Sequence, residues 1–242
     1  MSQPEILVVI PTYRDGASLA EFLPLLCEEL GRDATGAAVQ VVDDGSPLAE
    51  QIWLTAEVDR LRREYSNLRP LLTHSVNRGK GRAIRTGWSS EPRAPWLAFA
   101  DADGAAPATE VCALVNRARQ TREPALLIAV RAKTSGKPVA RFWHRKIGSW
   151  MFNVWVRYWL KFDLPDTQCG LKVIPGPFYA GIDWREDGFA FDLELLLRAR
   201  ASELPVISQP IAWTERAGSS LGFGSMIGLF IAVWRLRPRM AK

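Results

Sequence analysis

Two aspartates one residue apart are the positions of this sequence best suited to chemistry. Asp101 and Asp103 follow the apolar run 96–100, which is typical of a short buried strand. In an extended backbone, residues i and i+2 point to the same side, so both carboxylates can face one point. Two such carboxylates repel each other and raise each other's pKa unless a cation lies between them. Mg²⁺ and Mn²⁺ take oxygen ligands of this kind. The plainer alternative is a solvated turn.

The composition limits the classes of protein to which this chain can belong. Of its 242 residues, 48% are hydrophobic and 24% are charged, which is typical of a globular protein with a sizeable core. Its net charge of +5 favours an anionic partner, such as nucleotide phosphates or an acidic membrane surface. The 3 cysteines and 2 histidines lack the spacing of a disulfide framework or a zinc site. We expect neither a secretion signal nor a spanning helix, because no apolar run approaches about 20 residues.

Apolar runs alternate with amphipathic stretches, and these elements must position the two aspartates. Strands are predicted over residues 5–10, 39–42, 68–73, 96–101, 125–130 and 207–213. Helices are predicted over residues 18–30, 49–65, 82–90, 107–120 and 189–200. This alternation predicts an α/β protein with a mostly parallel sheet and helices on both of its faces.

Polar or charged side chains follow most of the predicted strands directly. In parallel sheets, ligands bind beyond the carboxyl ends of the strands. Turns need turn-forming residues but not repeated acids, so we interpret the set as a binding site at one edge of the sheet. The set comprises Asp15, Asp43, Asp44, Asn77, Lys80, Asp101, Asp103 and Arg131.

The loop Gly79-Lys80-Gly81 precedes a predicted helix but has neither P-loop nor dinucleotide-fingerprint spacing. A glycine-rich loop before a helix can still hold phosphate or ribose oxygens through its backbone N–H groups. Lys80 is therefore a candidate nucleotide-binding residue. The missing dinucleotide fingerprint disfavours NAD-dependent chemistry.

Several motifs, taken together and in order, resemble glycosyltransferase family 2. They are Val9-Ile10-Pro11-Thr12-Tyr13, Val42-Asp43-Asp44-Gly45-Ser46, Asn77-Arg78-Gly79-Lys80-Gly81 and Asp101-Ala102-Asp103. Three later motifs resemble the dolichyl-phosphate β-glucosyltransferases, with the dolichyl-phosphate mannose synthases as close relatives. These are Asp166-Thr167-Gln168-Cys169-Gly170-Leu171-Lys172, Ala190-Phe191-Asp192-Leu193-Glu194-Leu195-Leu196 and Trp213-Thr214-Glu215-Arg216-Ala217-Gly218-Ser219-Ser220.

This resemblance implies a GT-A (Rossmann-like) fold, a nucleotide-sugar donor, a divalent metal and inverting transfer to a polyprenyl phosphate. It implies that Pro11, Tyr13 and Asp15 line the base and ribose pocket and that Asp44 holds the base or ribose. By the same resemblance, Asp101 contacts ribose and metal.

The resemblance also assigns the residues around the reacting groups. It implies that Asp103 ligates a Mg²⁺ or Mn²⁺ ion bridging the donor diphosphate. Arg131 and Arg216, together with Ser219, would hold phosphate, mainly that of the acceptor. Asp192 and Glu194 would lie near the sugar.

One position departs from the pattern of the mannose synthases. The mannose synthases have a motif similar to Asp-Ala-Asp-x-Gln at this point, whereas Ala105 occupies the glutamine position here. The metal site of this loop would then rest on two side chains. The glucosyltransferases look similar at this position, which favours UDP-glucose over GDP-mannose as the donor.

Two segments combine aromatic and basic residues. Residues 139–162 carry an apolar stripe at helical spacing with more tryptophan and phenylalanine than one contact would bury. Residues 217–242 contain a short apolar part followed by a basic tail. Such helices favour docking on a membrane surface, although packing in a core or a solvated tail are alternatives. We therefore predict a GT-A domain over residues 1–216, with an amphipathic insertion at 139–162, and a membrane-associating segment over 217–242.

The expected protein is a peripheral enzyme on the cytoplasmic face of a membrane. A phosphate acceptor is already mostly dianionic at neutral pH, so it needs no general base. A family member acting on a hydroxyl acceptor is the enzyme alternative, and it would need Asp192 or Glu194 as the base. The non-enzyme alternative is a membrane-attached nucleotide-binding protein. Nucleic acid is not an expected partner, because the basic residues cluster beside an apolar C-terminus and not along a groove.

Overall fold

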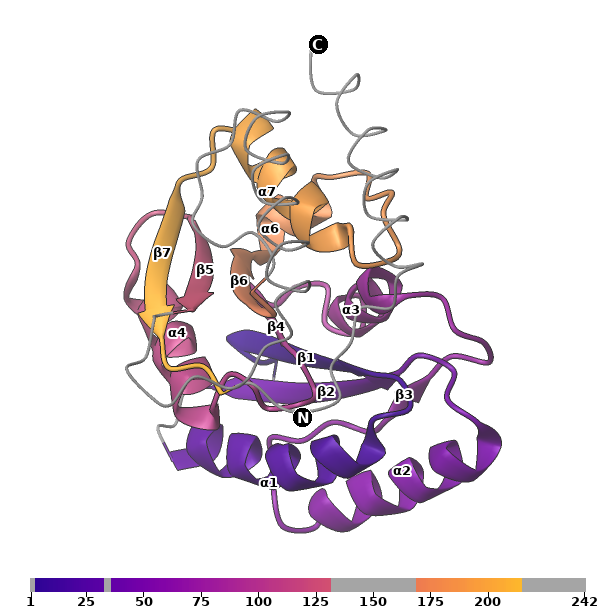
Figure 1. The fold of residues 1–242 in the computed structure, drawn as a ribbon. Coiled ribbons are helices and arrows are strands. Elements are labelled where there is room, and N and C mark those ends of the chain that lie inside the picture. The colour runs from indigo at the N-terminus through magenta and orange to yellow at the C-terminus, as the bar shows by residue number, and fades with distance from the viewer. Residues whose placement is uncertain (1–2, 33–35, 132–168, 215–242) are drawn as a thin grey trace, which may run out of the picture.

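The computed structural model describes residues 3–32, 36–131 and 169–214 (Figure 1). In these ranges the chain forms a seven-stranded sheet with the strand order β3-β2-β1-β4-β6-β5-β7. The strands are β1 (Ile6–Thr12), β2 (Ala37–Asp43), β3 (Leu72–Thr73), β4 (Trp96–Ala100), β5 (Leu126–Arg131), β6 (Leu171–Pro175) and β7 (Val206–Ile211). The helices are α1 (Gly16–Arg32), α2 (Leu48–Leu61), α3 (Lys80–Trp88), α4 (Ala108–Gln120), α6 (Gly176–Ala180) and α7 (Phe191–Ala201).

The sheet is mostly parallel, as the alternation of strands and helices predicts. β1 pairs in parallel with β2 and β4, β2 pairs in parallel with β3, and β5 pairs in parallel with β7. β6 is the exception, because it runs antiparallel to both of its neighbours, β4 and β5. β5 therefore has the same direction as β4, and the predicted α/β class is confirmed.

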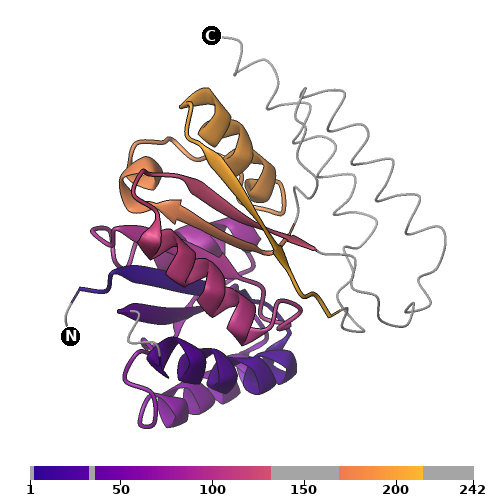
Figure 2. The same cartoon turned by 90° about the vertical axis from the view of Figure 1, so that its left-hand side faces the viewer.

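Helices cover both faces of the sheet because the central strands are apolar on both sides. In β1, Ile6, Val8 and Ile10 belong to one hydrophobic cluster, whereas Leu7 and Val9 belong to the other. This is the two-residue period of a strand buried on both faces. The first cluster includes residues of α1, α2 and α4, and the second includes residues of α3 and α7. Figures 1 and 2 show α1 and α2 on one side of the sheet and α6 and α7 on the other.

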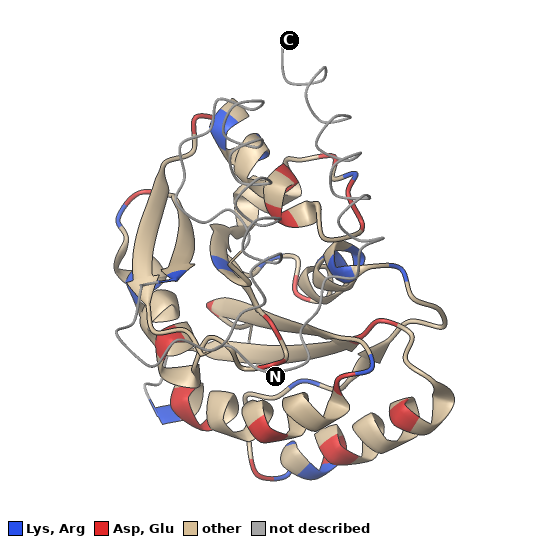
Figure 3. Cartoon of the chain, in the orientation of Figure 1, with Lys and Arg blue, Asp and Glu red and all other residues tan. Residues whose placement is uncertain are grey.

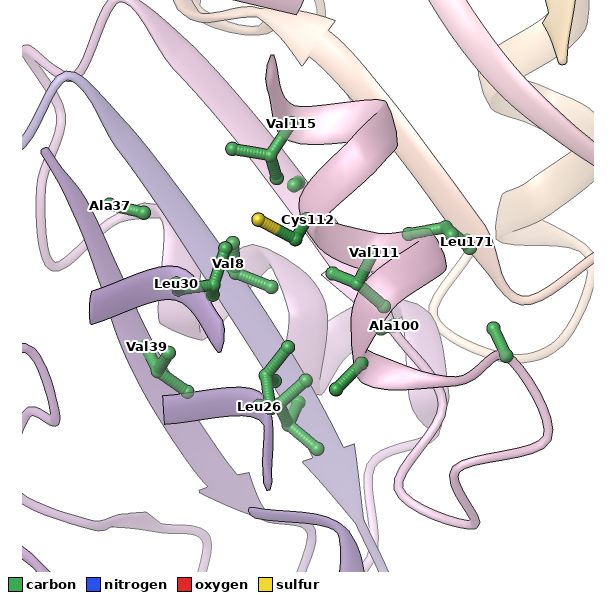
Figure 4. Packing of buried hydrophobic residues seen from close by; sticks show 14 of the residues in the cluster. Val8, Leu26, Leu30, Ala37, Val39, Ala100, Val111, Cys112, Val115 and Leu171 are labelled. Atoms are coloured by element: carbon green, nitrogen blue, oxygen red, sulfur yellow. The ribbon is translucent and has the colours of Figure 1, made fainter. Parts of the chain in front are cut away.

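The first cluster is packed from small and branched side chains. Figure 4 shows Val8 and Val39 of the sheet beside Leu26 and Leu30 of α1, with Val111 of α4 in the same cluster. Interdigitated packing of this kind fixes how the helices lie on the strands. It thereby fixes the loops that carry the polar residues beyond the strand ends.

The antiparallel strand β6 is absent from the sequence-based prediction. It pairs with β4 in the register Ala100↔Leu171 to Trp96↔Pro175. Leu171, Val173 and Ile174 are fully buried, but Lys172 between them interrupts the apolar run and hides the strand in the sequence. The consequence is that the chain just before β6, at Gly170, lies beside the end of β4.

The third predicted strand, residues 68–73, is shorter than expected. The structure has only the two-residue β3 and an isolated bridge between Val39 and Leu68. Pro70 lies between them and has no N–H group for a continuous ladder. The helix predicted at 82–90 begins earlier, so Lys80 is the first residue of α3, directly after Gly79 with its φ of 98°.

None of the helices in the described ranges is long and apolar enough to cross a bilayer. The predicted amphipathic segments 139–162 and 217–242 lie outside the described residues.

Candidate active site

Most of the predicted site residues of the described chain lie at one edge of the sheet, whereas Asp192 and Glu194 lie on α7. The carboxyl ends of β1, β2, β3, β4 and β5 share this edge, because these strands run in the same direction. Each strand delivers the polar residues that follow it to that edge. The structure thus brings together, on strand ends and the loops after them, Pro11, Tyr13, Asp15, Asp44, Lys80, Asp101, Asp103 and Arg131.

Asp101 is held on two sides at the end of β4. Its backbone N–H donates to the carbonyl of Gly170 at 3.0 Å, and its Oδ1 lies 2.7 Å from the ammonium nitrogen of Lys80. Its Oδ2 lies against Gly170, where a Cβ atom would come within 1.7 Å of that oxygen. Burial raises the pKa of Asp101, the charge of Lys80 opposes this rise, and the nearby Asp192 and Asp103 add to it. A cation at this point would favour the ionised carboxylate.

Asp103 lies in the turn that follows β4. Its Oδ1 accepts a hydrogen bond from the N–H of Ala105 at 2.9 Å, and Gly104 has a positive φ of 63°. The side chain of Asp103 is half-buried and lies two residues beyond Asp101.

The donor set fits a hard divalent ion that is shared with a ligand. In the described part of the chain, no group of three or more His, Cys, Asp or Glu side chains is placed to hold a metal. Mg²⁺ often binds through only one or two carboxylates together with substrate phosphates. Asp101 and Asp103 supply such a pair, so these two residues would hold the ion and a diphosphate would complete its ligands.

Asp192 lies at the start of α7 between two lysines. Its Oδ1 accepts a hydrogen bond from Lys172, and its Oδ2 lies 3.4 Å from the Lys80 nitrogen. Burial alone would raise the pKa of Asp192, but the ammonium groups of Lys172 and Lys80 outweigh it and lower the pKa. Burial likewise opposes the charge of Lys80, yet Asp101 and Asp192 raise the pKa of Lys80. Asp192 is therefore ionised and a weak base.

Glu194 is fully buried and holds a loop in place. Its Oε2 accepts hydrogen bonds from the N–H groups of Arg185 at 3.1 Å and Glu186 at 2.8 Å. Its Oε1 accepts a hydrogen bond from Arg198 at 3.1 Å. Both oxygens are thus engaged within the protein, which makes Glu194 unsuited to remove a proton from a substrate.

Asp44 anchors the loop that leads into α3. Its Oδ1 accepts from the N–H of Arg78 at 2.9 Å and lies 2.7 Å from His74 Nδ1, while its Oδ2 accepts from the N–H of Gly79 at 2.7 Å. A carboxylate offers about four acceptor positions, so most of them are used here. The predicted direct contact with a nucleotide stays a prediction.

Pro11 lies near the end of β1, and Tyr13 and Asp15 lie in the loop between β1 and α1. Tyr13 is exposed, Pro11 and Asp15 are half-buried, and the carbonyl of Asp15 accepts the N–H of Leu19 in the first turn of α1. An exposed ring at a sheet edge is suited to stacking on a flat base.

Arg131 ends β5, and β6 alone separates β5 from β4. This places it roughly 10 Å from the β4 end along the sheet, given the usual strand spacing. It is exposed, and its guanidinium lies 5.4 Å from the ring centroid of Trp213. Arg216 and Ser219, predicted beside it, lie outside the described residues.

Sequence reasoning missed Lys172 and Gly170 as site residues. Lys172 contacts Asp192, and Gly170 contacts Asp101. A lysine within an apolar run and a glycine just before it were the available signals. Neither signal pointed to a partner, because both partners are remote in the sequence.

Three comparisons bear on this arrangement. The model of the family described as "Glycosyl transferase family 2" matches residues 7–182. Human dolichyl-phosphate β-glucosyltransferase is 30% identical over 234 residues, which cover 90% of this chain and 69% of that protein. The polyprenol monophosphomannose synthase of Mycolicibacterium smegmatis is 28% identical over 249 residues, covering 97% of this chain and 88% of that protein.

Solved structures share the fold. A glucosyl-3-phosphoglycerate synthase from Mycobacterium tuberculosis, in complex with Mn²⁺, UDP and glucosyl-3-phosphoglycerate, superposes with a TM-score of 0.67 at 12% identity, covering 96% of this chain and 80% of that one. A mannosyltransferase from Pyrobaculum calidifontis, in complex with GDP-Man and Mn²⁺, has a TM-score of 0.63 at 18% identity, and 98% of this chain covers 61% of that one. These matches confirm the GT-A fold that the sequence resemblance implies.

Proposed function

Because the chain belongs to glycosyl transferase family 2, we propose that it transfers a hexose from a nucleotide-sugar to a polyprenyl or dolichyl phosphate. Relatives of this chain include a dolichyl-phosphate β-glucosyltransferase, a polyprenol monophosphomannose synthase and an undecaprenyl-phosphate mannosyltransferase, so both glucose and mannose occur among their sugars. UDP-glucose is the proposed donor, supported by Ala105 and by the several β-glucosyltransferases among the relatives. The proposed cofactor is Mg²⁺ or Mn²⁺, as in the titles of the matched structures.

The observation that carries this proposal is that the carboxylates of Asp192 and Glu194, the two candidate bases, are both engaged within the protein. Lys172 and Lys80 hold Asp192 as a weak base, and Glu194 is enclosed by backbone N–H groups. A hydroxyl acceptor would need a proton acceptor at the site. A phosphate monoester has a second pKa of about 6, so it is already ionised at neutral pH and attacks without a proton acceptor. The site therefore favours an acceptor that arrives ionised, over a saccharide hydroxyl.

The proposed reaction is one in-line displacement. An oxygen of the acceptor phosphate forms a bond to the anomeric carbon while the bond from that carbon to the donor diphosphate breaks. The nucleoside diphosphate leaves with the electron pair, the configuration inverts, and no proton is transferred. A divalent ion held by Asp101 and Asp103 would neutralise charge on the departing diphosphate.

Arg131 would reduce the electrostatic repulsion between the acceptor phosphate and the donor diphosphate. Its guanidinium stands at the same edge as Asp101, at the end of a strand that fixes its backbone through the register Arg131↔Ile211. Such a group offsets acceptor charge in the transition state. Residues 1–216 would form the catalytic domain, and residues 139–162 and 217–242 would dock it on the cytoplasmic face of a membrane.

Arg131→Ala is expected to lower kcat/KM for the lipid phosphate about 10- to 100-fold because a charge facing the acceptor is lost. The temperature of unfolding should change little, because the side chain is exposed. Arg63→Ala, an exposed arginine on the turn after α2, is the matched control and should leave activity unchanged. Equal activity of Arg131→Ala and wild type would contradict the role given to Arg131.

The function itself is tested with purified protein, Mn²⁺ and radiolabelled UDP-glucose, GDP-mannose and other nucleotide-sugars. Label should move into the lipid fraction only when polyprenyl phosphate is present. The rate should fall as the pH drops below about 6, where the acceptor phosphate becomes a monoanion. Turnover with a soluble saccharide and none with the lipid phosphate would overturn the proposal.

A further inference from the structure

Four charged side chains of alternating sign form a chain from the buried interior of the protein to the edge of the sheet. They are Lys172 on β6, Asp192 on α7, Lys80 at the start of α3 and Asp101 at the end of β4. Lys172 contacts Asp192, Asp192 lies 3.4 Å from Lys80, and Lys80 lies 2.7 Å from Asp101. Figure 3 shows basic positions on β6 and α3 and positions of both signs on α7, three of the elements that contribute to this chain.

Exposure rises steadily along these four residues. The exposed fraction of the side chain is 0% for Lys172, 6% for Asp192, 13% for Lys80 and 34% for Asp101. A ligand at the sheet edge can therefore reach the Asp101 end, whereas the Lys172 end lies inside the protein. Lys172 can therefore act on a ligand only indirectly, and its contacts with charged side chains lead to Asp101 through Asp192 and Lys80.

Stability alone gives no reason for a lysine at position 172. Its neighbours in β6 are fully buried Leu171 and Val173, and removing an ammonium group from water is costly even when it is paired. Apolar residues of similar volume in place of a buried ion pair are often neutral or stabilising. Lys172 donates to the Cys169 carbonyl at 2.7 Å and to Asp192, so its proton donors are directed at the protein.

The arrangement does fix orientation. Each oxygen of Asp192 receives one ammonium group, which sets the plane of the carboxylate. Lys80 is thereby held between Asp192 and Asp101, with its nitrogen 5.2 Å from the ring centroid of Phe99. A lysine side chain is otherwise free about several bonds, so the second contact restricts where it meets Asp101. Gly170 confines the other oxygen of Asp101.

We propose that Lys172 is a positioning residue of the donor site: through Asp192 and Lys80 it fixes the Asp101 carboxylate toward the metal-bound diphosphate of a nucleotide. The inference rests on the proposed function, because it assumes that the edge binds a nucleotide with a divalent ion. Partners that orient a metal-binding side chain are typically worth about 10- to 100-fold in metal affinity or activity.

The test uses the full chain as wild type, Lys172→Met and the double variant Lys172→Met/Asp192→Leu. Calorimetry measures Mn²⁺ binding in the presence of UDP and, separately, of GDP, and thermal unfolding is measured in parallel. Both variants are expected to bind Mn²⁺ about 10-fold or more weakly. The double variant should unfold at or above the temperature of the single variant. In the single variant the buried Asp192 carboxylate loses Lys172, whereas in the double variant that carboxylate is absent.

The control removes a different partly buried ion pair. Arg69 contacts Glu91 at 2.9 Å near the opposite end of α3 from Lys80. Arg69→Met should lower the temperature of unfolding while Mn²⁺ affinity stays at the wild-type value. A decrease in affinity equal to that of Lys172→Met would overturn the proposal, since the effect would then be a general one.

Two other results would overturn the role of Lys172. One is wild-type Mn²⁺ affinity in the double variant. The other is a double variant that does not fold, since the pair would then be a structural requirement. If the wild-type protein fails to bind Mn²⁺ both in the presence of UDP and in the presence of GDP, that result would instead contradict the proposed function.

Discussion

Asp103→Asn is expected to reduce sugar transfer about 10³-fold while the protein remains folded. Asparagine has the same shape, and its side-chain oxygen can still accept the N–H of Ala105 that Asp103 accepts at 2.9 Å. The substitution thus preserves the turn and removes one negative charge. Of the two carboxylates that would hold the divalent ion, Asp103 is the one without a lysine in contact in the described structure.

The measurement combines transfer to polyprenyl phosphate at saturating donor with a titration of Mn²⁺. A shift of the Mn²⁺ requirement to higher concentration, with an unchanged temperature of unfolding, would support the assigned role. Asp59→Asn is the matched control, because Asp59 pairs with Arg62 on the surface of α2 and such pairs contribute little. Transfer by Asp103→Asn within about threefold of wild type would rule out Asp103 as a metal-binding residue.

Gly170→Ala has the second-largest expected effect, although it adds only one methyl group. The new Cβ would lie 1.7 Å from Oδ2 and 2.2 Å from Cγ of Asp101. Gly170 cannot simply retreat, because its carbonyl accepts the backbone N–H of Asp101 at 3.0 Å. The Asp101 carboxylate must therefore move, which displaces the oxygen that contacts Lys80.

A displacement of about 1 Å at a reacting centre costs roughly a hundredfold in rate, so we expect a decrease of at least this size in kcat for Gly170→Ala. Overpacking of this kind also destabilises a protein by about 1–3 kcal/mol, so activity must be measured well below the unfolding temperature. Gly188→Ala is the control, because a Cβ atom there meets nothing within 4 Å. Equal losses in the two variants, or full activity of Gly170→Ala, would contradict the account of Asp101.

The two variants test different parts of one arrangement. Asp103→Asn changes charge without changing shape, whereas Gly170→Ala changes shape without changing charge. The proposed function requires both to lower activity, because the divalent ion needs its charge partners and also their placement.

The sequence by itself determined the α/β class and most of the elements. Continuous apolar runs such as residues 6–10 identify strands buried on both faces, since few other structures hide so many consecutive apolar side chains. The edge that collects Asp44, Asp101, Asp103 and Arg131 followed from the same alternation, because parallel strands all end on one side. For these reasons the candidate residues could be named before the fold was known.

Only the tertiary structure decided which of these residues contact each other and which are held away from a ligand. β6 enters the sheet from a remote part of the chain, and it is this pairing that brings Gly170 and Lys172 beside Asp101 and Asp192. From the sequence, Glu194 was a possible base for a hydroxyl acceptor, yet it is a fully buried acceptor of hydrogen bonds from a loop. Contacts between distant residues depend on the register of paired strands and on packing, and neither leaves a local pattern in the sequence.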